Sequence, residues 1–126
     1  MKIFFALILI LSFAFGEHIR WRNDFDKVLV EAKRTQKDIL LLILKKDCDI
    51  CKSVFTDIFN EKEIQDKVEQ KYVPVVVFFE NKNSYPIELF YTIRFPALFF
   101  VSREDESFLK KPLFENFTKG ELLNSL

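Results

Sequence analysis

Residues 39–52 read ILLLILKKDCDICK, and this stretch decides the expected fold. The six aliphatic residues from Ile39 to Leu44 are too few for a typical helix and are apolar on both faces, as in a central strand that is covered on both sides. Cys48 and Cys51 come directly after the polar residues that end this run. Apolar residues then recur at helical spacing, at Val54, Phe55, Ile58 and Phe59. The cysteines therefore mark a junction between a strand and a helix.

Capping residues and apolar periodicity predict the other helices. The expected capping or first-turn residues are Asn23 or Asp24, Asn60 with Glu63, Pro86, and Thr118 with Glu121. The first of these helices has one apolar face, formed by Phe25, Val28, Leu29 and Ala32. The helix that begins at Pro86 is expected to be short, since an apolar strand follows it closely.

Three more segments have the pattern of strands. Residues 73–79 and 97–101 are apolar runs that predict buried strands, and Pro74 is tolerable near the start of the first one. Residues 108–114 predict an edge strand, because Pro112 interrupts them. The order of helices and strands along the chain predicts an α/β sandwich.

The first sixteen residues have the pattern of a signal peptide. Lys2 precedes an apolar run, and Ala14 and Gly16 supply the small residues required for a cut before Glu17. The run is shorter than the roughly 20 apolar residues of a transmembrane helix, so an uncleaved membrane anchor is the alternative. Residues 17–126 are expected to form one exported domain.

Charge and ligand counts exclude two classes of function. The chain has 19 Lys and Arg against 19 Asp and Glu, so no basic field would attract nucleic acid. Structural zinc takes four ligands from Cys and His, whereas this chain has two cysteines and a distant His18. Neither nucleic acid nor a metal is therefore an expected ligand.

The cysteine spacing points to thiol chemistry. Unpaired N–H groups and the dipole at a helix start stabilise the Cys48 thiolate, which lowers its pKa and makes it a nucleophile. Cys51, one turn deeper, would resolve a mixed disulfide by attacking Cys48. No histidine lies between them, so a reductase or general exchange role is favoured over a strongly oxidising one.

A structural disulfide is the alternative interpretation, because oxidation is the default for exported proteins. A bridge between Cys48 and Cys51 closes a very small loop and removes little chain entropy, so it stabilises less than one spanning ~15 residues, worth about 3 kcal/mol. The position after a buried strand and at a helix start favours redox chemistry.

The Cys48–Cys51 motif, the strand before it and the Phe95–Pro96 step together resemble the thioredoxin superfamily. A proline that opens an apolar strand some 45 residues after the cysteines is similar to the family's cis-proline loop. The run from Trp21 to Lys52 is more specifically similar to the periplasmic thioredoxin-related and DsbD C-terminal-domain-like group. The resemblance implies a three-layer sandwich, with a central mixed β-sheet flanked by helices.

The resemblance also implies roles for individual residues. Cys48 would be the nucleophile and Cys51 the resolving thiol, with no cofactor required. Pro96 would be the cis-proline, and the Phe95 backbone would pair with a substrate peptide. The expected substrate-binding residues are Phe95, Pro96, Asp49 and Ile50.

Three positions depart from the family pattern. Asp47 stands where a tryptophan usually precedes the first cysteine, and Leu42 stands where many members bury a carboxylate. Proton transfer at Cys51 then lacks its usual buried relay. The glycine expected in the turn before the last strand is also missing, which would reshape the sheet edge near the site.

By this resemblance the chain is expected to be a periplasmic thiol–disulfide oxidoreductase that acts on cysteine pairs of exported proteins. A membrane-embedded DsbD-like or CcdA-like protein is the expected electron donor, and the chain is expected to be a monomer. If the leader is uncleaved, the domain would be anchored facing the periplasm. The alternative is a non-catalytic binding module of the same fold, in which the Cys48–Cys51 disulfide is structural.

Overall fold

The computed structural model describes residues 19–126. Three features lie outside the described residues: the predicted signal peptide, its predicted cleavage site before Glu17, and the residue His18. Within residues 19–126, no helix combines the length and the apolar character needed to cross a membrane.

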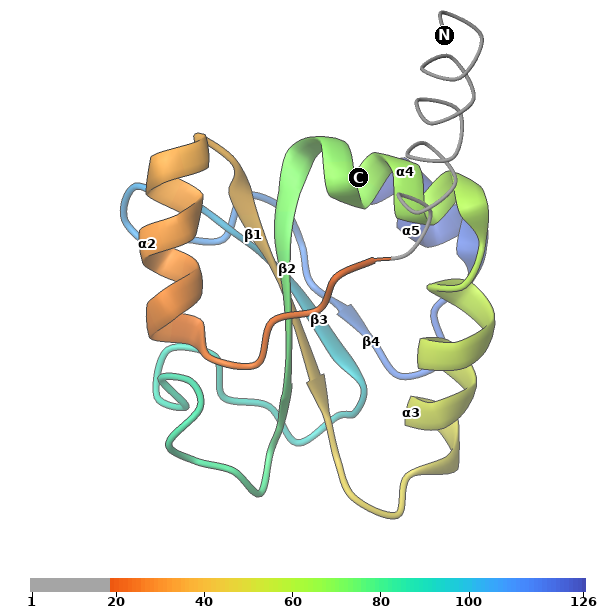
Figure 1. Ribbon diagram of the computed structural model, residues 1–126. Coiled ribbons are helices and arrows are strands. Elements are labelled where there is room, and N and C mark those ends of the chain that lie inside the picture. Colours follow the sequence, from red (N-terminus) through yellow and green to blue (C-terminus); the bar gives the residue numbers. More distant parts are fainter. Residues whose placement is uncertain (1–18) are drawn as a thin grey trace, which may run out of the picture.

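Four strands form one mixed sheet, in the order β2-β1-β3-β4 (Figure 1). β1 (Asp38–Leu44) pairs in parallel with β2 (Tyr72–Phe78) and antiparallel with β3 (Ala97–Val101). β4 (Leu113–Phe114) extends the sheet antiparallel to β3. Residues 39–44 are all buried, which confirms the prediction of a central strand covered on both faces.

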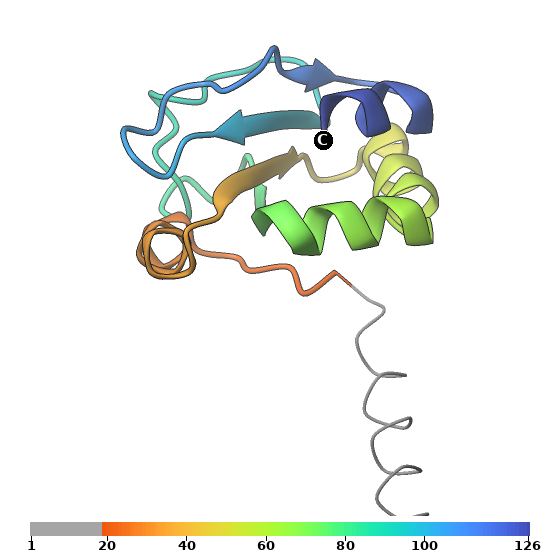
Figure 2. The ribbon, with the colours of Figure 1, turned by 90° about the horizontal axis from the view of Figure 1, so that it is seen from above.

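Helices cover both faces of this sheet, so the predicted three-layer sandwich is confirmed (Figures 1 and 2). Ile39, Leu41 and Ile43 face α2 (Phe25–Thr35), whereas the alternate residues of β1 face the opposite layer. That layer consists of α3 (Asp49–Ser53), the π-helix η1 (Val54–Ile58), α4 (Lys62–Lys71) and α5 (Lys119–Ser125).

Two of the predicted helix caps are confirmed and one is wrong. The Asp24 carboxylate accepts a hydrogen bond from the Lys27 N–H of α2 (3.2 Å), and Thr118 with Glu121 forms a capping box on α5. The Asn60 capping box does not form, because α4 begins after Glu61, which makes no side-chain cap hydrogen bond. The break between the helices follows η1 directly, at residues 59–61.

The expected short helix from Pro86 is also wrong. Residues 79–96 form turns instead, with a turn hydrogen bond from the Leu89 N–H to the Pro86 carbonyl (3.0 Å). Tyr85 and Phe90 are buried in the core beneath α2, where the Phe90 ring lies 5.3 Å from that of Phe25. Tyr85 and Phe90 are five positions apart, so in a helix they would lie on different faces and could not both enter this core. Their burial therefore outweighs the helical periodicity of the segment.

The predicted edge strand at residues 108–114 is shorter in the structure. Only its last two residues form β4, and Phe108 makes an isolated bridge to Val101. Pro112 has no N–H to donate and directly precedes the two paired residues. The missing donor explains why regular pairing begins at Leu113.

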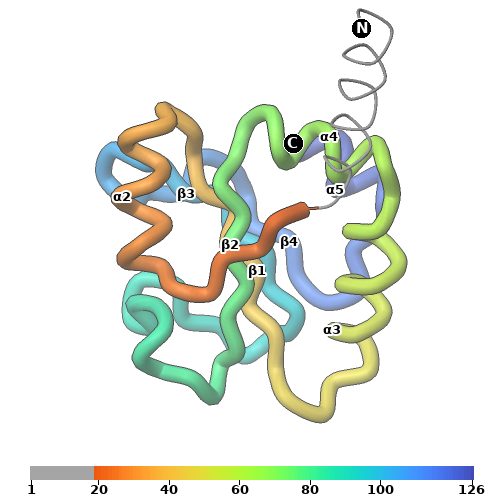
Figure 3. Tube along the Cα trace, viewed as in Figure 1, coloured from red at the N-terminus to blue at the C-terminus, as the bar shows by residue number. Residues whose placement is uncertain are grey.

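The segment before α2 runs beside the outer edge of β2 (Figure 3). The Arg22 N–H donates to the Pro74 carbonyl (3.0 Å), and the Val76 N–H donates to the Arg22 carbonyl (2.8 Å). Pro74 therefore faces the same outer edge, where its missing N–H costs no hydrogen bond to β1.

Candidate active site

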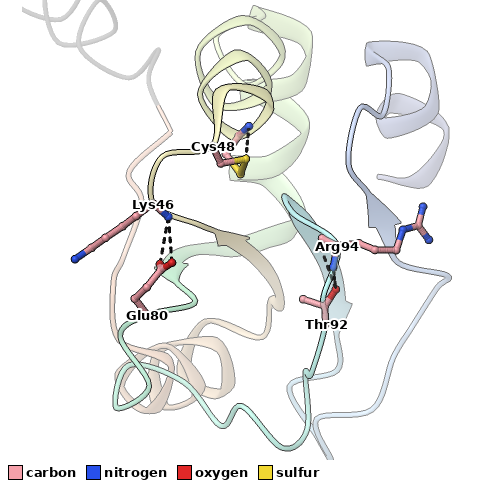
Figure 4. Close-up of a disulfide and its surroundings, with 6 residues drawn as sticks. Lys46, Cys48, Glu80, Thr92 and Arg94 are labelled. Carbon is pink, nitrogen blue, oxygen red and sulfur yellow. Dashed lines mark hydrogen bonds between the residues drawn. A yellow bond between two sulfur atoms is a disulfide. The ribbon is translucent and has the colours of Figure 1, made fainter.

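Cys48 and Cys51 form a disulfide where β1 leads into α3 (Figure 4). Their Cα atoms are 5.2 Å apart, which is within the usual range for disulfides. Cys51 is 2% exposed and belongs to the core beneath α3, whereas Cys48 is only partly buried. The expected difference between an accessible first cysteine and a shielded second cysteine is confirmed.

The Cys48 side chain caps the helix that it begins. Its Sγ atom accepts a hydrogen bond from the Cys51 N–H (3.1 Å), and its backbone is extended, with φ −115° and ψ 105°. The Cys48 carbonyl accepts from the Lys52 N–H (3.2 Å), so the helix starts at this residue. An N–H directed at Sγ would stabilise negative charge on this sulfur after reduction.

A π-helical turn follows the disulfide directly. The Phe59 N–H donates to the Val54 carbonyl (3.4 Å), five residues earlier, and both side chains are buried. Phe55 and Ile58 are partly buried against the same core, so the predicted apolar face is confirmed. Trp21 packs on this segment, 5.6 Å from the Phe55 ring and 5.2 Å from the Phe59 ring.

A carboxylate that the sequence did not indicate holds the loop before Cys48. Glu80 accepts from the Lys46 backbone N–H, at 3.2 and 3.4 Å from its two oxygens (Figure 4). The parallel register pairs Leu44 with Phe78, so the residues two positions further along each strand meet. Only that register could have identified Glu80, because it is 34 positions from Lys46 in the chain.

Glu80 also lies close enough to Tyr85 to affect its ionisation. Burial raises the pKa of the Tyr85 hydroxyl, and the negative charge of Glu80 raises it further. This hydroxyl is buried with no hydrogen-bond partner among the described residues. Tyr85 is therefore neutral at physiological pH.

The Phe95–Pro96 peptide bond is cis and leads directly into β3. Phe95 is partly buried, with its ring centroid 5.1 Å from that of Phe79 and 5.7 Å from the Lys45 ammonium. The Pro96 carbonyl accepts from the Glu115 N–H (2.8 Å), which ties this turn to β4.

The residues just before this turn are held by their own side chains (Figure 4). The Thr92 hydroxyl accepts from the Arg94 N–H and donates to the Arg94 carbonyl, both at 3.0 Å. The Arg94 guanidinium pairs with Glu115 (2.9 Å) and lies 4.8 Å from the Phe114 ring centroid. These contacts fix the approach of the chain to Phe95.

The fold brings the predicted site residues to one end of the sheet. Antiparallel pairing of Ile43 with Ala97 places Pro96 beside the end of β1 from which Cys48 follows. Phe95 packs against the same core cluster as Cys48 and Cys51. The remaining two predicted residues, Asp49 and Ile50, are exposed on the first turn of α3.

The departures from the family pattern persist in three dimensions. Leu42 is fully buried on the α3 side of β1, in the core that also holds Cys51. The buried polar side chains among residues 19–126 are Gln65, Thr92 and Ser102, so none of them is a carboxylate. Asp47 has a left-handed backbone (φ 56°) and an exposed side chain.

A pocket of about 510 Å³ adjoins the disulfide on the β2 side. Val76 and Phe78 contribute from β2, and Phe55 and Thr56 contribute from η1. The remaining lining residues are Leu44, Lys45, Lys46, Asp47, Cys48, Cys51 and Lys52. Most of the lining surface is therefore apolar, and three exposed lysines contribute to it.

Charges of both signs surround the cysteines. Lys45, Lys46 and Lys52 oppose Asp47 and Asp49 within a few positions of Cys48 in the sequence. Within the described range, no three His, Cys, Asp or Glu side chains gather into a cluster that could hold a metal ion.

Comparisons with known proteins agree with this geometry. The model of a family described as thioredoxin-like matches residues 20–102. Similar solved structures include a thioredoxin from Thermus thermophilus, with 15% identity, a TM-score of 0.73, and coverage of 85% of this chain and 83% of that chain. A DsbH oxidoreductase has 20% identity and a TM-score of 0.71, with 86% of this chain and 81% of that chain covered.

The oxidised C-terminal domain of Neisseria meningitidis DsbD is a third similar structure, with 15% identity and a TM-score of 0.64. The match covers 79% of this chain and 87% of that domain. At these identities the solved structures establish the fold alone. No curated protein sequence matches at a significant level. Because the family model spans well over half of the sequence, the chain belongs to the thioredoxin-like family.

Proposed function

We propose that this protein is a thiol–disulfide oxidoreductase that exchanges electrons with cysteine pairs of exported proteins. The observation that carries the proposal is the disulfide between a partly exposed Cys48 and a buried Cys51, next to the Phe95–Pro96 turn. A nucleophile must be reached by a substrate, whereas a resolving thiol must be protected from it.

The first step would start from the reduced protein. The Cys48 thiolate attacks one sulfur of a substrate disulfide and forms a mixed disulfide with it. The second substrate sulfur leaves as a thiolate and takes up a proton. The Cys51 N–H, which donates to Sγ of Cys48, supports the attacking thiolate.

The second step would release the substrate. Cys51 loses its proton, and its thiolate attacks Sγ of Cys48, which restores the Cys48–Cys51 disulfide. The first substrate sulfur then leaves as a thiolate and is protonated. Two electrons have passed from the protein dithiol to the substrate disulfide, and a dithiol donor must reduce the protein before the next cycle.

Cys51 would lose its proton without a buried carboxylate beside it. Leu42 is fully buried at the position where the family resemblance implies an acid. Water that enters the pocket next to both cysteines offers an alternative acceptor. We therefore expect the second step to be slow relative to the first.

The turn at Phe95 would hold the substrate backbone. Neither the N–H nor the carbonyl of Phe95 has a hydrogen-bond partner within residues 19–126. An extended substrate segment could satisfy both groups, with Asp49 and Ile50 facing it from α3. This role rests on the family resemblance and on the free backbone groups together.

The direction and place of the reaction are inferred from the sequence. With no histidine between the cysteines, we propose reduction or general exchange in the periplasm, with electrons from a membrane-embedded DsbD-like or CcdA-like protein. The leader at residues 1–16 would direct the export.

A redox titration tests the proposal. Residues 17–126 would be equilibrated in glutathione or dithiothreitol buffers, and free thiols would be alkylated and counted by mass spectrometry. We expect the pair to titrate between roughly −120 and −270 mV. The Cys51→Ser variant serves as a control, because it cannot form the bridge: Cys48 should be alkylated in every dithiothreitol buffer and should carry one glutathione in oxidising glutathione buffers.

The same titration identifies the non-catalytic alternative. Full burial of Leu42 favours that alternative, since it removes an expected proton relay. A structural bridge should titrate below about −300 mV and should leave Cys48 unreactive toward substrate disulfides. That result would overturn the proposed function and leave the non-catalytic alternative.

A further inference from the structure

We propose that the pocket beside the disulfide is a second recognition site for the partner protein. It would take an apolar side chain next to the partner's cysteine, and its lysines would pair with an acidic residue that comes after that side chain. This inference rests on the proposed function and names the class of polypeptide on which it acts.

The pocket lies on the opposite side of the disulfide from Pro96. β1 separates β3, which follows Pro96, from β2, which supplies Val76 and Phe78 to the pocket. A substrate segment could therefore pair with the Phe95 turn on one side of the disulfide and place a side chain in the pocket on the other side.

The shape and lining of the pocket fit an apolar group. Its volume of about 510 Å³ lies within the typical range for ligand pockets, roughly 300–1,000 Å³. Leu44, Val76 and Phe55 supply apolar walls, and both cysteines form part of the lining. Any occupant would thus lie beside the sulfur atoms.

Two large apolar side chains, one in the pocket lining and one next to Cys51, are exposed, which favours a polypeptide over a small disulfide. Phe78 is 44% exposed at its edge, and Ile50 is 45% exposed on the first turn of α3. Large exposed apolar groups next to a pocket are typical of protein interaction sites. A segment of several residues would cover both side chains.

The charges at the rim select an anionic neighbour. Lys46 and Lys52 line the pocket against one acid, Asp47, and no described carboxylate forms an ion pair with either lysine. The Lys45 ammonium lies over the Phe95 ring (5.7 Å) and is therefore directed to the other side of the disulfide. Figure 4 shows the Lys46 side chain extending away from Thr92 and Arg94, the residues that precede the Phe95–Pro96 turn in the chain. Complementary charge of this kind contributes mainly to specificity and association rate.

Three cyclic peptides would test the site, each with one internal disulfide. In each peptide a dipeptide directly follows the cysteine that Cys48 is to attack, and the three dipeptides are Leu-Glu, Leu-Lys and Ser-Glu. We expect the reduced protein to reduce the Leu-Glu peptide about tenfold faster, in kcat/KM, than the Ser-Glu peptide, because the leucine enters the pocket. We expect kcat/KM for the Leu-Glu peptide to exceed that for the Leu-Lys peptide about threefold or more, and we expect this ratio to be smaller at high salt.

Variants assign these two preferences to the pocket. Phe78→Ser should remove the preference for leucine over serine, and Lys46→Glu with Lys52→Glu should remove or reverse the preference for glutamate over lysine. The matched control is Lys62→Glu with Lys67→Glu, two exposed lysines of α4 that do not line the pocket, and it should keep both ratios. Ratios measured within one variant cancel differences in the folded fraction.

Failure of the site and failure of the function give different results. Equal rates for all three peptides, in a protein that still reduces hydroxyethyl disulfide, would overturn the recognition site and leave the proposed function standing. Reduction of oxidised glutathione as fast as the Leu-Glu peptide would also overturn it, in favour of a small anionic disulfide. If no disulfide is reduced, the proposed function itself is wrong.

Discussion

Asp24 and Cys48 begin two helices with almost the same geometry. Asp24 has φ −136° and ψ 114°, Cys48 has φ −115° and ψ 105°, and each side chain accepts from the N–H three residues later, at 3.2 and 3.1 Å. The acceptor atom is a carboxylate oxygen in one case and sulfur in the other. One arrangement of the backbone therefore serves stability in α2 and, by our proposal, chemistry in α3.

The two helices differ in their course after the cap. α2 runs regularly for 11 residues after a strong acceptor, whereas α3 runs for 5 residues before it widens into the π-helix. Sulfur is a weak hydrogen-bond acceptor, so the start of α3 depends more on burial of Cys51 and Val54. Because the Cys48 sulfur is a weaker cap than an oxygen atom, the position of the disulfide depends on the packing of the core beneath α3.

The largest expected effect concerns the reactive cap. Both Cys48→Ser and Cys51→Ser should reduce turnover of a disulfide peptide by on the order of 10³-fold or more, since each removes one step of the exchange. The two variants should differ in the species that they accumulate. Mass spectrometry should find a mixed disulfide with Cys51→Ser and none with Cys48→Ser, and the reverse pattern would make Cys51 the nucleophile.

The next effect concerns the core that α2 covers. Phe25→Ala should lower the free energy of unfolding by about 3–5 kcal/mol, because Phe25 is fully buried against the sheet. Val30→Ala on the same helix is the control and should change it by no more than about 0.5 kcal/mol, because Val30 is 68% exposed. Urea unfolding measures both values, and equal losses would show that α2 does not anchor this layer.

A smaller effect isolates the oxygen cap. Asp24→Ala should lower the free energy of unfolding by about 1 kcal/mol, since the Lys27 N–H loses its acceptor. Asp66→Ala, which removes an exposed carboxylate within α4, should stay within about 0.5 kcal/mol of the parent. No loss in Asp24→Ala would mean that the core alone fixes the start of α2.

The smallest effect tests whether the position of Cys48 acts as a cap at all. In a Cys51→Ala background, Cys48→Ser should be more stable than Cys48→Ala by about 0.5–1 kcal/mol, because the hydroxyl can accept from the N–H of residue 51. Thermal or urea unfolding of the two proteins measures the difference. Equal stability would show that the sulfur contact is a consequence of the bridge and does not define the helix start.

Most interactions between residues close in the chain were predicted correctly from the sequence, with the Asn60 capping box as an exception. The aliphatic run of β1, the caps at Asp24 and Thr118, and the disulfide spacing of Cys48 and Cys51 each depend on a few neighbouring residues. The family resemblance added the three-layer arrangement. The helix predicted from local periodicity at Pro86 does not form, because the burial of Tyr85 and Phe90 in the core decides the path of the chain there.

The sequence by itself determined the central strand and the position of the cysteines directly after it. Only the tertiary structure decided that Glu80 holds the Lys46 backbone, that η1 widens after the disulfide, and that a pocket opens between β2 and η1. The physical reason is that capping and periodicity act within one or two turns of chain. Strand register and packing join residues dozens of positions apart, and no local pattern encodes them.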